Sequence, residues 1–459
     1  MLDQLIAPDI KALIEAGNFD EIAAFIEDRH PTEAAEILTA LPEDDVNLIL
    51  EKLPLQTSAD IFCELPGAIQ SHIASKLNKN DLAKLVLRLS PDDRVDLLKS
   101  LPEDQFDAVL PVLAKREREE IKKLASYKEG TAGSIMTTDY IALPADMTVR
   151  QALDRIRLEG PEKESIYTIF ALDEGRHLVG TVRLADLILA HPSKILRDIM
   201  DDQVVSVQVE ADQEDATYKF SRYDLVALPV VDASGALVGI ITHDDVLDVI
   251  EQERTEDMER FMAISGKHQD AGYLQTSIWT HFSHRVVWLI ILSVLGLVSG
   301  AILQSFEATL MNLMILAFYM PMLADTGGNT GSQSATVVVR ALALKEISPK
   351  DILKIVWKEA RVGLLLALVL GIFAFLRVYL TSRGVSIPES ISLVNVGFAI
   401  GVALGIQVLS ATVIGALLPL IAAAFGLDPA LVASPALTTI VDISGLFIYF
   451  STARLILNI

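Results

Sequence analysis

Long uncharged stretches divide the C-terminal part of the chain into segments of membrane-spanning length. Residues 286–303 are eighteen positions without a charged side chain, and residues 390–427 are thirty-eight. About twenty apolar residues cross a bilayer as a helix, and no turn cluster divides the longer run, which we expect to form one long or tilted helix. The other expected segments are residues 308–339, the run after Arg361, and residues 428–454. The pattern predicts five membrane helices within residues 285–459.

The second of these segments contains a run of small and polar residues, "DTGGNTGSQ", at positions 325–333. Gly-rich backbone at membrane depth is tolerated only where it faces protein or a water-filled cavity. There it offers carbonyl and amide oxygens to a cation, whereas its small residues also permit tight helix packing. Both interpretations remain open, and they are compatible. The expected pore-lining residues are Gly327, Gly328, Asn329, Gly331 and Gln333.

Asp442 lies near the middle of the last segment, within "ALTTIVDISGLFIYF". A charged side chain at the membrane centre costs roughly 2.5–3.5 kcal/mol on insertion scales. Asp442 therefore marks a functional site, unless it only makes a hydrogen bond between helices. Thr438 and Thr439 lie one turn earlier and Ser434 two turns earlier, which gives a polar stripe at helical spacing. We expect Asp442, Ser434 and Thr438 to line a watery path that faces the polar run.

A twelve-residue spacing organises residues 1–130. Most of the repeated leucines are followed directly by proline, and acidic residues come next, which is typical of helix N-termini. The pattern predicts an all-α domain of stacked short helices, two in each 24-residue unit. The repeated residues are Leu41, Leu53, Leu65, Leu77, Leu89 and Leu101.

Residues 131–255 contain two copies of an α/β pattern. An Ile-Met pair at 135–136 recurs at 199–200, and "HLVGTVRLADLI" matches "ALVGIITHDDVL". This arrangement resembles a tandem pair of CBS domains, a module that binds adenosine nucleotides. The resemblance implies a ribose contact from a Ser/Thr-x-x-Asp step, which Thr242 and Asp245 match. In the first copy Asp186 matches, but Arg183 replaces the hydroxyl residue, so ATP binding is expected only as an option.

The charge is distributed very unevenly. Residues 1–285 carry 53 acidic and 29 basic side chains, whereas residues 286–459 carry 8 and 9. This indicates an acidic soluble part joined to a membrane part, with cations rather than nucleic acid as partners. Short basic loops stay cytoplasmic, and six basic residues lie within 340–361. We expect a multi-pass protein of the cell membrane with its soluble domains in the cytoplasm.

Eight acidic residues lie between positions 244 and 260. At helical spacing several of them share a face, and like charges three or four residues apart destabilise a helix. Divalent cations such as Mg²⁺ would relieve this repulsion through carboxylate oxygens. The alternative is a solvated acidic connector that is partly neutralised by Arg254 and Arg260.

The remaining features speak against an enzyme. Cys63 is the only cysteine, which excludes an internal disulfide or a cysteine-based metal site, and the eight histidines are scattered. The polar run lacks the Lys-Ser/Thr of a phosphate-binding loop. The N-terminus has no basic region and no long apolar run, so we expect no signal peptide.

Taken in order, these features resemble the MgtE family of magnesium transporters. The motifs that carry the resemblance are "GGNTGSQSATVVVRALA" and "VDISGLFIYFSTARL", together with the CBS pair, the acidic connector and the helical repeat. The resemblance implies a homodimeric Mg²⁺ channel with its pore on the dimer axis. It implies a superhelical domain at 1–130, tandem CBS domains at 131–255, a connecting plug helix at 256–284 and a membrane domain at 285–459.

The resemblance also implies regulation by cytoplasmic Mg²⁺. Asp442 would hold a largely hydrated Mg²⁺ in the pore, while Mg²⁺ bridging acids of the soluble elements would close it. The implied sensor acids are Asp212, Glu214, Asp224, Asp245, Asp248, Glu253, Glu256 and Asp257, with Asp428 in the membrane domain and Asp92 and Asp96 in the N-terminal domain.

The sequence can be compared with two other transport functions. A divalent cation transporter of broader selectivity, for Co²⁺ and others, would use the same residues. A CBS-regulated anion channel fits poorly because Asp442 and the oxygen-rich motif favour cations and no basic pore residue is evident.

Overall fold

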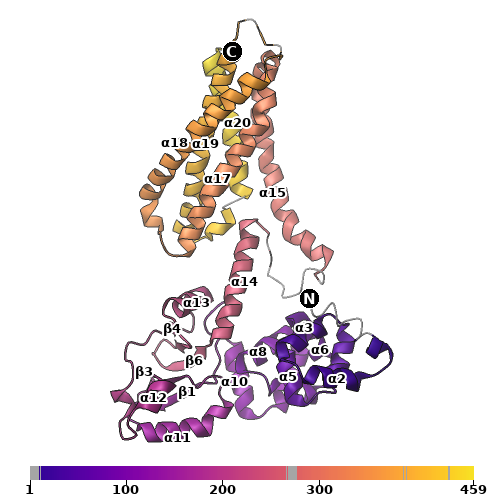
Figure 1. The fold of residues 1–459 in the computed structure, drawn as a ribbon, viewed down its shortest axis with the longest axis vertical. Coiled ribbons are helices and arrows are strands. Elements are labelled where there is room, and N and C mark those ends of the chain that lie inside the picture. Colours follow the sequence, from indigo (N-terminus) through magenta and orange to yellow (C-terminus); the bar gives the residue numbers. More distant parts are fainter. Residues whose placement is uncertain are drawn as a thin grey trace. The chain divides into compact units, whose positions relative to one another are not determined.

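The computed structural model describes residues 10, 12–264, 266, 276–385, 387–388, 390–432 and 435–459. They form two compact units, and the chain passes from the first to the second after Glu253, within helix α14 (His243–Phe261). Figure 1 shows helices at the N-terminal end, a mixed α/β region, and long helices at the C-terminal end. This order agrees with the predicted fold class of helical repeat, tandem CBS module and helical membrane domain.

The N-terminal region is a stack of short helices in which each helix packs against the next but one. Contacts of this kind join α2 to α4, α4 to α6, α6 to α8, and α8 to α10. The two-helix, 24-residue unit is therefore confirmed. The helices are α2 (Phe19–Glu27), α3 (Pro31–Thr39), α4 (Glu43–Leu50), α5 (Leu55–Cys63), α6 (Gly67–Lys76), α7 (Lys79–Val86), α8 (Pro91–Ser100), α9 (Glu103–Val109) and α10 (Lys115–Ala125).

The repeated leucines form the core of this stack. Five of the six are buried, and Leu77 packs against the same core while remaining partly accessible. The prolines that follow Leu41, Leu53, Leu65 and Leu101 occupy the N-cap positions of the next helices. There they fix the backbone before the helix begins, and their missing N–H removes no helical hydrogen bond.

Two three-stranded sheets follow, and they have the same topology. In each sheet the first and second strands are parallel, and the second and third are antiparallel. The first copy contains β1 (Ile141–Pro144), α11 (Val149–Glu159), β2 (Thr168–Leu172), β3 (Leu178–Arg183) and α12 (Leu184–Leu189). The second contains β4 (Val207–Gln208), α13 (Gln213–Arg222), β5 (Leu228–Val231), β6 (Leu237–Ile241) and α14.

The recurring Ile-Met and Val-Gly motifs pack against each other across the two copies. A Cβ atom on Gly239 would lie 2.5 Å from the sulfur of Met136, and one on Gly180 would lie 2.4 Å from the sulfur of Met200. The segment before each copy thus covers the last strand of the other. Glycine is needed at both positions because the methionine side chain occupies the space that a Cβ would take.

The described residues of the second unit form five long helices. Four of them are long and apolar enough to cross a membrane, while α17 carries the polar run, so the count of five membrane helices stays a prediction. Residues 393–424 form a single helix, as predicted from the uncharged run. The elements are α15 (Ile278–Ser305), α16 (Glu307–Asn312), α17 (Met320–Ala343), α18 (Ile352–Thr381), α19 (Leu393–Ala424) and α20 (Pro435–Leu457).

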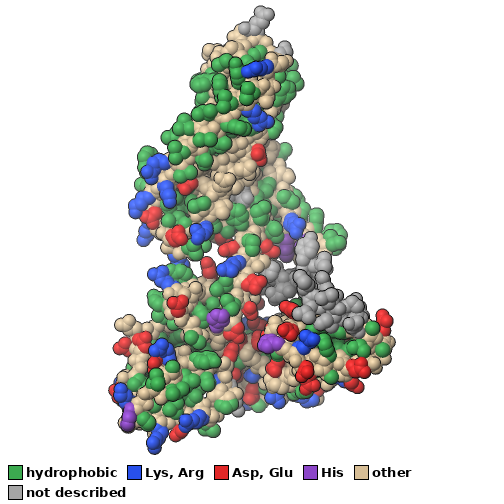
Figure 2. Space-filling view, viewed as in Figure 1, with side chains coloured by type: hydrophobic (Ala, Val, Ile, Leu, Met, Phe, Trp, Pro, Cys, Tyr) green, Lys and Arg blue, Asp and Glu red, His purple; other side chains and the backbone are tan. Residues whose placement is uncertain are grey.

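Helix α19 lies at the centre of this unit. It contacts α17, α18 and α20, and α20 also contacts α15 and α17. Half of the most apolar stretch of α19 is buried, whereas the most apolar stretch of α15 is not buried at all. On the face drawn in Figure 2, hydrophobic side chains cover the long helices, and acidic side chains are frequent in the soluble part.

Candidate cation sites

The polar run is an uninterrupted helix that packs closely on its neighbours. A Cβ on Gly415 of α19 would lie 2.3 Å from the carbonyl oxygen of Gly331, and one on Gly331 would lie 3.2 Å from that of Ala411. Because residues 320–343 are α-helical, their carbonyl groups bond within the helix. The glycines therefore serve helix packing, one of the two interpretations that the sequence left open, and their carbonyl groups are engaged within the helix.

This packing leads to a stability prediction for α19. We expect Gly415→Ala to destabilise the protein by about 1–3 kcal/mol, because the added methyl group forces the backbones of α17 and α19 apart. Gly405→Ala is the matched control, since its Cβ would meet Ala367 at an ordinary 3.5 Å. Thermal unfolding in detergent measures both variants. Equal melting temperatures for the two would contradict the close contact.

Three polar side chains of α17 lie on its exposed face, whereas Thr330 and Ser334 are buried. Asp325, Asn329 and Gln333 are spaced by four residues and are all exposed, and Asn329 Nδ2 donates to Asp325 Oδ1 at 3.2 Å. On α20, Asp442 is half-buried, with Thr438 one turn earlier. A Cβ on Gly328 would lie 3.4 Å from the Thr438 methyl group, so α17 and α20 meet beside this turn.

Gln407 is a residue that the sequence analysis missed. It is fully buried in α19, and its Nε2 donates to the carbonyl oxygen of Val441 at 2.9 Å. Cβ atoms on Gly327 and Gly445 would lie 2.5 and 2.4 Å from that nitrogen. Gln407 thus ties α19 to α20 at the residue before Asp442. Its only sequence signal is an isolated amide within a long apolar helix.

A group of carboxylates surrounds the start of α14. Oxygen atoms of Glu164, Asp244 and Asp245 lie within 4.8 Å of one another. Asp92, from α8, is 7% exposed, and its Oδ1 has no hydrogen-bond partner in the described part of the chain. We call Asp92, Glu164, Asp244 and Asp245 the carboxylate cluster. It includes the predicted Asp92 and Asp245, and it adds Glu164 and Asp244.

The pKa values of three acids of the carboxylate cluster are raised, because these acids are at least partly buried and repel one another. Burial, together with repulsion from neighbouring carboxylates, raises the pKa of Asp245 to about 7 and that of Glu164 to about 7. Burial and repulsion from Asp245 also raise the pKa of Asp92. Oxygen-only donors suit hard divalent cations such as Mg²⁺, and the unpaired buried oxygen of Asp92 fits such an ion. A bound cation would supply the positive charge that the cluster lacks.

Thr242 and Asp245, the predicted ribose step, bond to each other. Thr242 Oγ1 donates to Asp245 Oδ2 at 2.6 Å, and the Thr242 backbone N–H donates to the same oxygen at 3.3 Å. In the first copy, Arg183 donates two hydrogen bonds to Asp186, at 2.7 and 3.0 Å. A nucleotide would therefore have to replace existing contacts in both copies.

The other predicted sensor acids of the first unit do not join the cluster. Asp212 caps α13 by accepting from the Glu214 backbone N–H at 2.8 Å, and Glu253 accepts from Gln213 Nε2 at 2.7 Å. Asp224 has a positive φ of 49°. The remaining acids, Asp96 on α8, Glu214 on α13 and Asp248 on α14, are exposed. Partial desolvation and repulsion from Asp244 raise the pKa of Asp248.

In the second unit, Arg260 joins two predicted sensor acids. Its guanidinium donates to Asp428 Oδ2 at 2.8 Å and also pairs with Glu256, one turn earlier on α14. Phe261 packs against the cluster formed by Ala335, Ala411, Leu437 and Val441. The end of α14 is thus fixed to the membrane helices by an arginine where a divalent ion was expected. Asp257 lies beside this contact in sequence, and Ser434 lies outside the described residues.

Comparison with known proteins identifies the family. The chain is 36% identical to the magnesium transporter MgtE of Thermus thermophilus over 460 residues, which covers 100% of both proteins. The chain belongs to the MgtE family. It is also 31% identical to MgtE of Bacillus subtilis, over 98% of this chain and 97% of that protein. The family described as divalent cation transporter matches residues 320–452, the MgtE intracellular N domain matches 29–130, and CBS domains match 132–192 and 196–252.

A solved structure supports the same assignment for the soluble part. The cytosolic domain of the Mg²⁺ channel MgtE in complex with ATP is 34% identical and covers 52% of this chain and 98% of that chain, with a TM-score of 0.50. The MgtE relatives are named as transporters, in agreement with the prediction that this chain is not an enzyme. With the apolar helices of its C-terminal region, the chain is a multi-pass membrane protein with soluble N-terminal and CBS domains.

Proposed function

We propose that this protein conducts Mg²⁺ into the cell along a path that includes Asp442, and that Mg²⁺ bound to its cytoplasmic acids closes this path. The observation that carries the proposal is the half-buried carboxylate of Asp442, one helical turn after Thr438. Both residues lie within the part of the chain that matches the divalent cation transporter family. The relatives named above are magnesium transporters. Mg²⁺ dehydrates reluctantly, so a carboxylate that binds the ion through its water shell suits selective passage.

The exposed polar face of α17 supports assembly as a homodimer. Asp325, Asn329 and Gln333 would face hydrocarbon in an isolated chain, and polar groups there are costly unless they face protein or water. A second copy that covers this face and the neighbouring side of α20 would bring two Asp442 residues toward one axis. The five helices α15, α17, α18, α19 and α20 would then each cross the membrane, within the proposed domain of residues 285–459.

The carboxylate cluster supports the proposed gating. A cation there would relieve the repulsion among Asp92, Asp245 and their neighbours, and it would thereby favour the arrangement that brings α8 beside α14. High cytoplasmic Mg²⁺ would populate that arrangement and close the pore. The proposed domains are residues 1–130, 131–255 and a connecting helix at 256–284, and the soluble parts would lie in the cytoplasm. ATP would modulate the response at Thr242, Asp245 and Asp186.

Ion flux through the purified full-length protein in liposomes tests the transported ion. We expect Mg²⁺ influx driven by an inside-negative potential, and we expect equimolar Co²⁺ to compete only weakly with this influx. Co²⁺ sheds its water shell more easily than Mg²⁺, so it gains less from a site built for the hydrated ion. Equal transport of both ions would favour the alternative, a divalent cation transporter of broader selectivity. Absence of flux for either ion would contradict both.

A further inference from the structure

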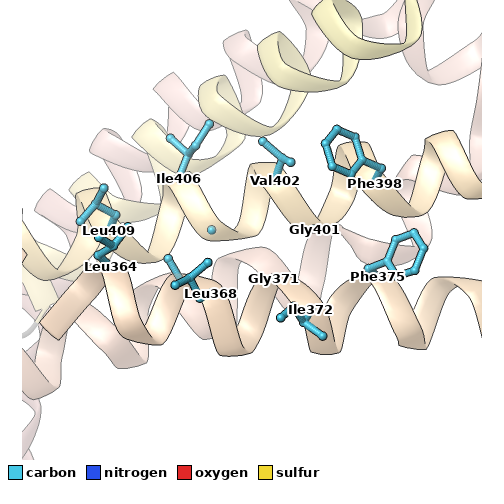
Figure 3. Close-up of a pocket in the computed structure, with 12 residues that line it drawn as sticks. Leu364, Leu368, Gly371, Ile372, Phe375, Phe398, Gly401, Val402, Ile406 and Leu409 are labelled. Atoms are coloured by element: carbon cyan, nitrogen blue, oxygen red, sulfur yellow. The ribbon is translucent and has the colours of Figure 1, made fainter. Parts of the chain in front are cut away.

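The outer faces of α18 and α19 enclose an apolar groove with a volume of about 500 Å³. Its floor forms where the two backbones meet, since a Cβ on Gly401 would lie 2.7 Å from the carbonyl oxygen of Gly371. Large side chains rise on both sides of this contact (Figure 3). The walls are Leu364, Leu368, Ile372 and Phe375 on α18 and Phe398, Val402, Ile406 and Leu409 on α19.

Two aromatic–arginine pairs, one near each end of α18, place the groove within the bilayer. The Arg361 guanidinium lies 5.8 Å from the centre of the Trp357 ring, and the Arg383 guanidinium lies 5.1 Å from that of Tyr379. Trp, Tyr and Arg typically mark the two membrane interfaces. From Arg361 to Thr381, where α18 ends, the helix rises by about 30 Å, which matches the ~30 Å hydrocarbon thickness.

The groove lies mainly in the half of this thickness that is nearer Arg361. It runs from Leu364, one turn after Arg361, to Phe375, which is about 16 Å along the helix and matches one leaflet of roughly 15 Å. Arg361, within α18, is the last of the six basic residues in 340–361 and is exposed, so this half is the cytoplasmic leaflet by the positive-inside rule. An acyl chain lying in the groove would place its headgroup beside the Arg361 guanidinium.

A second copy of the chain is a less suitable occupant. Helix α19 contacts α18, and it also contacts α17 and α20, which contact each other. The polar residues that need covering lie on α17 and α20. The groove contains no such residue. Many of its wall residues are exposed, Ile372 at 60% and Phe398 at 56%, as expected of a surface that faces lipid.

We propose that the groove between α18 and α19 binds one acyl chain of an anionic phospholipid from the cytoplasmic leaflet, with the headgroup held by Arg361. Acyl chains match the uniformly apolar lining, and the leaflet on this side is the one that carries anionic lipids. The proposal rests on the membrane position of α18 and α19 and is independent of the transported ion.

Native mass spectrometry of the full-length protein tests this, with phosphatidylglycerol and phosphatidylcholine as probes. We expect one phosphatidylglycerol retained per chain in preference to phosphatidylcholine. Gly405→Leu should remove it, because the side chain rises from the groove floor where a Cβ meets only an ordinary 3.5 Å contact. Gly296→Leu on α15, where a Cβ would have nothing within 4 Å, is the matched control and should retain the lipid.

The headgroup contact is tested separately. Arg361→Gln should weaken phosphatidylglycerol binding about fivefold, the equivalent of roughly 1 kcal/mol per basic side chain near an anionic surface, and leave phosphatidylcholine unchanged. Arg383→Gln, at the opposite end of α18, should change neither. Equal retention of the two lipids, retention by Gly405→Leu, or loss of the dimer in Gly405→Leu would each overturn the proposal, the last because it would make the groove an interface between copies. Thermal unfolding of each variant confirms that it is folded.

Discussion

Replacing Asp442 with alanine is expected to lower Mg²⁺ uptake by at least about thirtyfold. A divalent ion 4 Å from a carboxylate gains roughly 2 kcal/mol in water-like surroundings and about 8 kcal/mol at an effective dielectric of 20, and the smaller value already corresponds to a factor of about thirty. The measurement is Mg²⁺ influx into liposomes at equal amounts of folded protein. Asp442→Glu should restore part of the flux, because it returns the charge with one extra methylene group.

Asp351→Asn serves as the control for this experiment. Asp351 lies in the basic loop, where it pairs with Lys354 at 3.0 Å, and its loss removes one acidic charge from the same unit without touching α17 or α20. We expect its uptake to match that of the unaltered protein. If Asp442→Ala also transported normally, the path for the ion would have to lie elsewhere.

Neutralising the carboxylate cluster is expected to abolish inhibition by cytoplasmic Mg²⁺. In the combined variant Asp92→Asn, Glu164→Gln, Asp244→Asn and Asp245→Asn, the Mg²⁺ concentration for half-inhibition should rise at least about tenfold, since even outer-shell changes cost that much metal affinity. Basal flux at low Mg²⁺ should remain. The control is Asp44→Asn with Asp154→Asn, two exposed acids that pair with Lys76 and Arg157. Unchanged inhibition in the combined variant would show that the cluster is a solvated structural feature.

The raised pKa values add a test of the same cluster that does not depend on transport. Asp245 and Glu164 titrate near 7 in the folded protein and near 4 when unfolded. With the metal chelated, the folded state holds more protons between these values, so its stability falls as the pH rises from about 4 to 7. Mg²⁺ offsets the repulsion of the ionised groups and should therefore raise the melting temperature more at pH 8 than at pH 6. The combined variant should lose this difference.

Local patterns in the sequence were sufficient to predict the fold class. The twelve-residue leucine spacing predicted the stacked helices, because each leucine lies at an equivalent inward position. The recurring Ile-Met and Val-Gly motifs predicted two equal modules, and the uncharged runs predicted long membrane helices, including the unbroken α19. Such patterns repeat over a few residues, and burial of one face of a helix or strand is enough to produce them. Asp442 was found in the same way, as a charge within an apolar run.

Only the tertiary structure decided the contacts between residues that are distant in the sequence. Glu164 lies about eighty positions before Asp244 and Asp245, and nothing in its local sequence marks it as their neighbour. Arg260 donates a hydrogen bond to Asp428, 168 positions away. The family resemblance of the sequence had instead implied a divalent metal ion beside Asp428. The polar run looked like a source of carbonyl ligands, yet its glycines are required by the approach of α19. These outcomes depend on which helices pack together, because a side chain's partner is set by that packing and not by its neighbours along the chain.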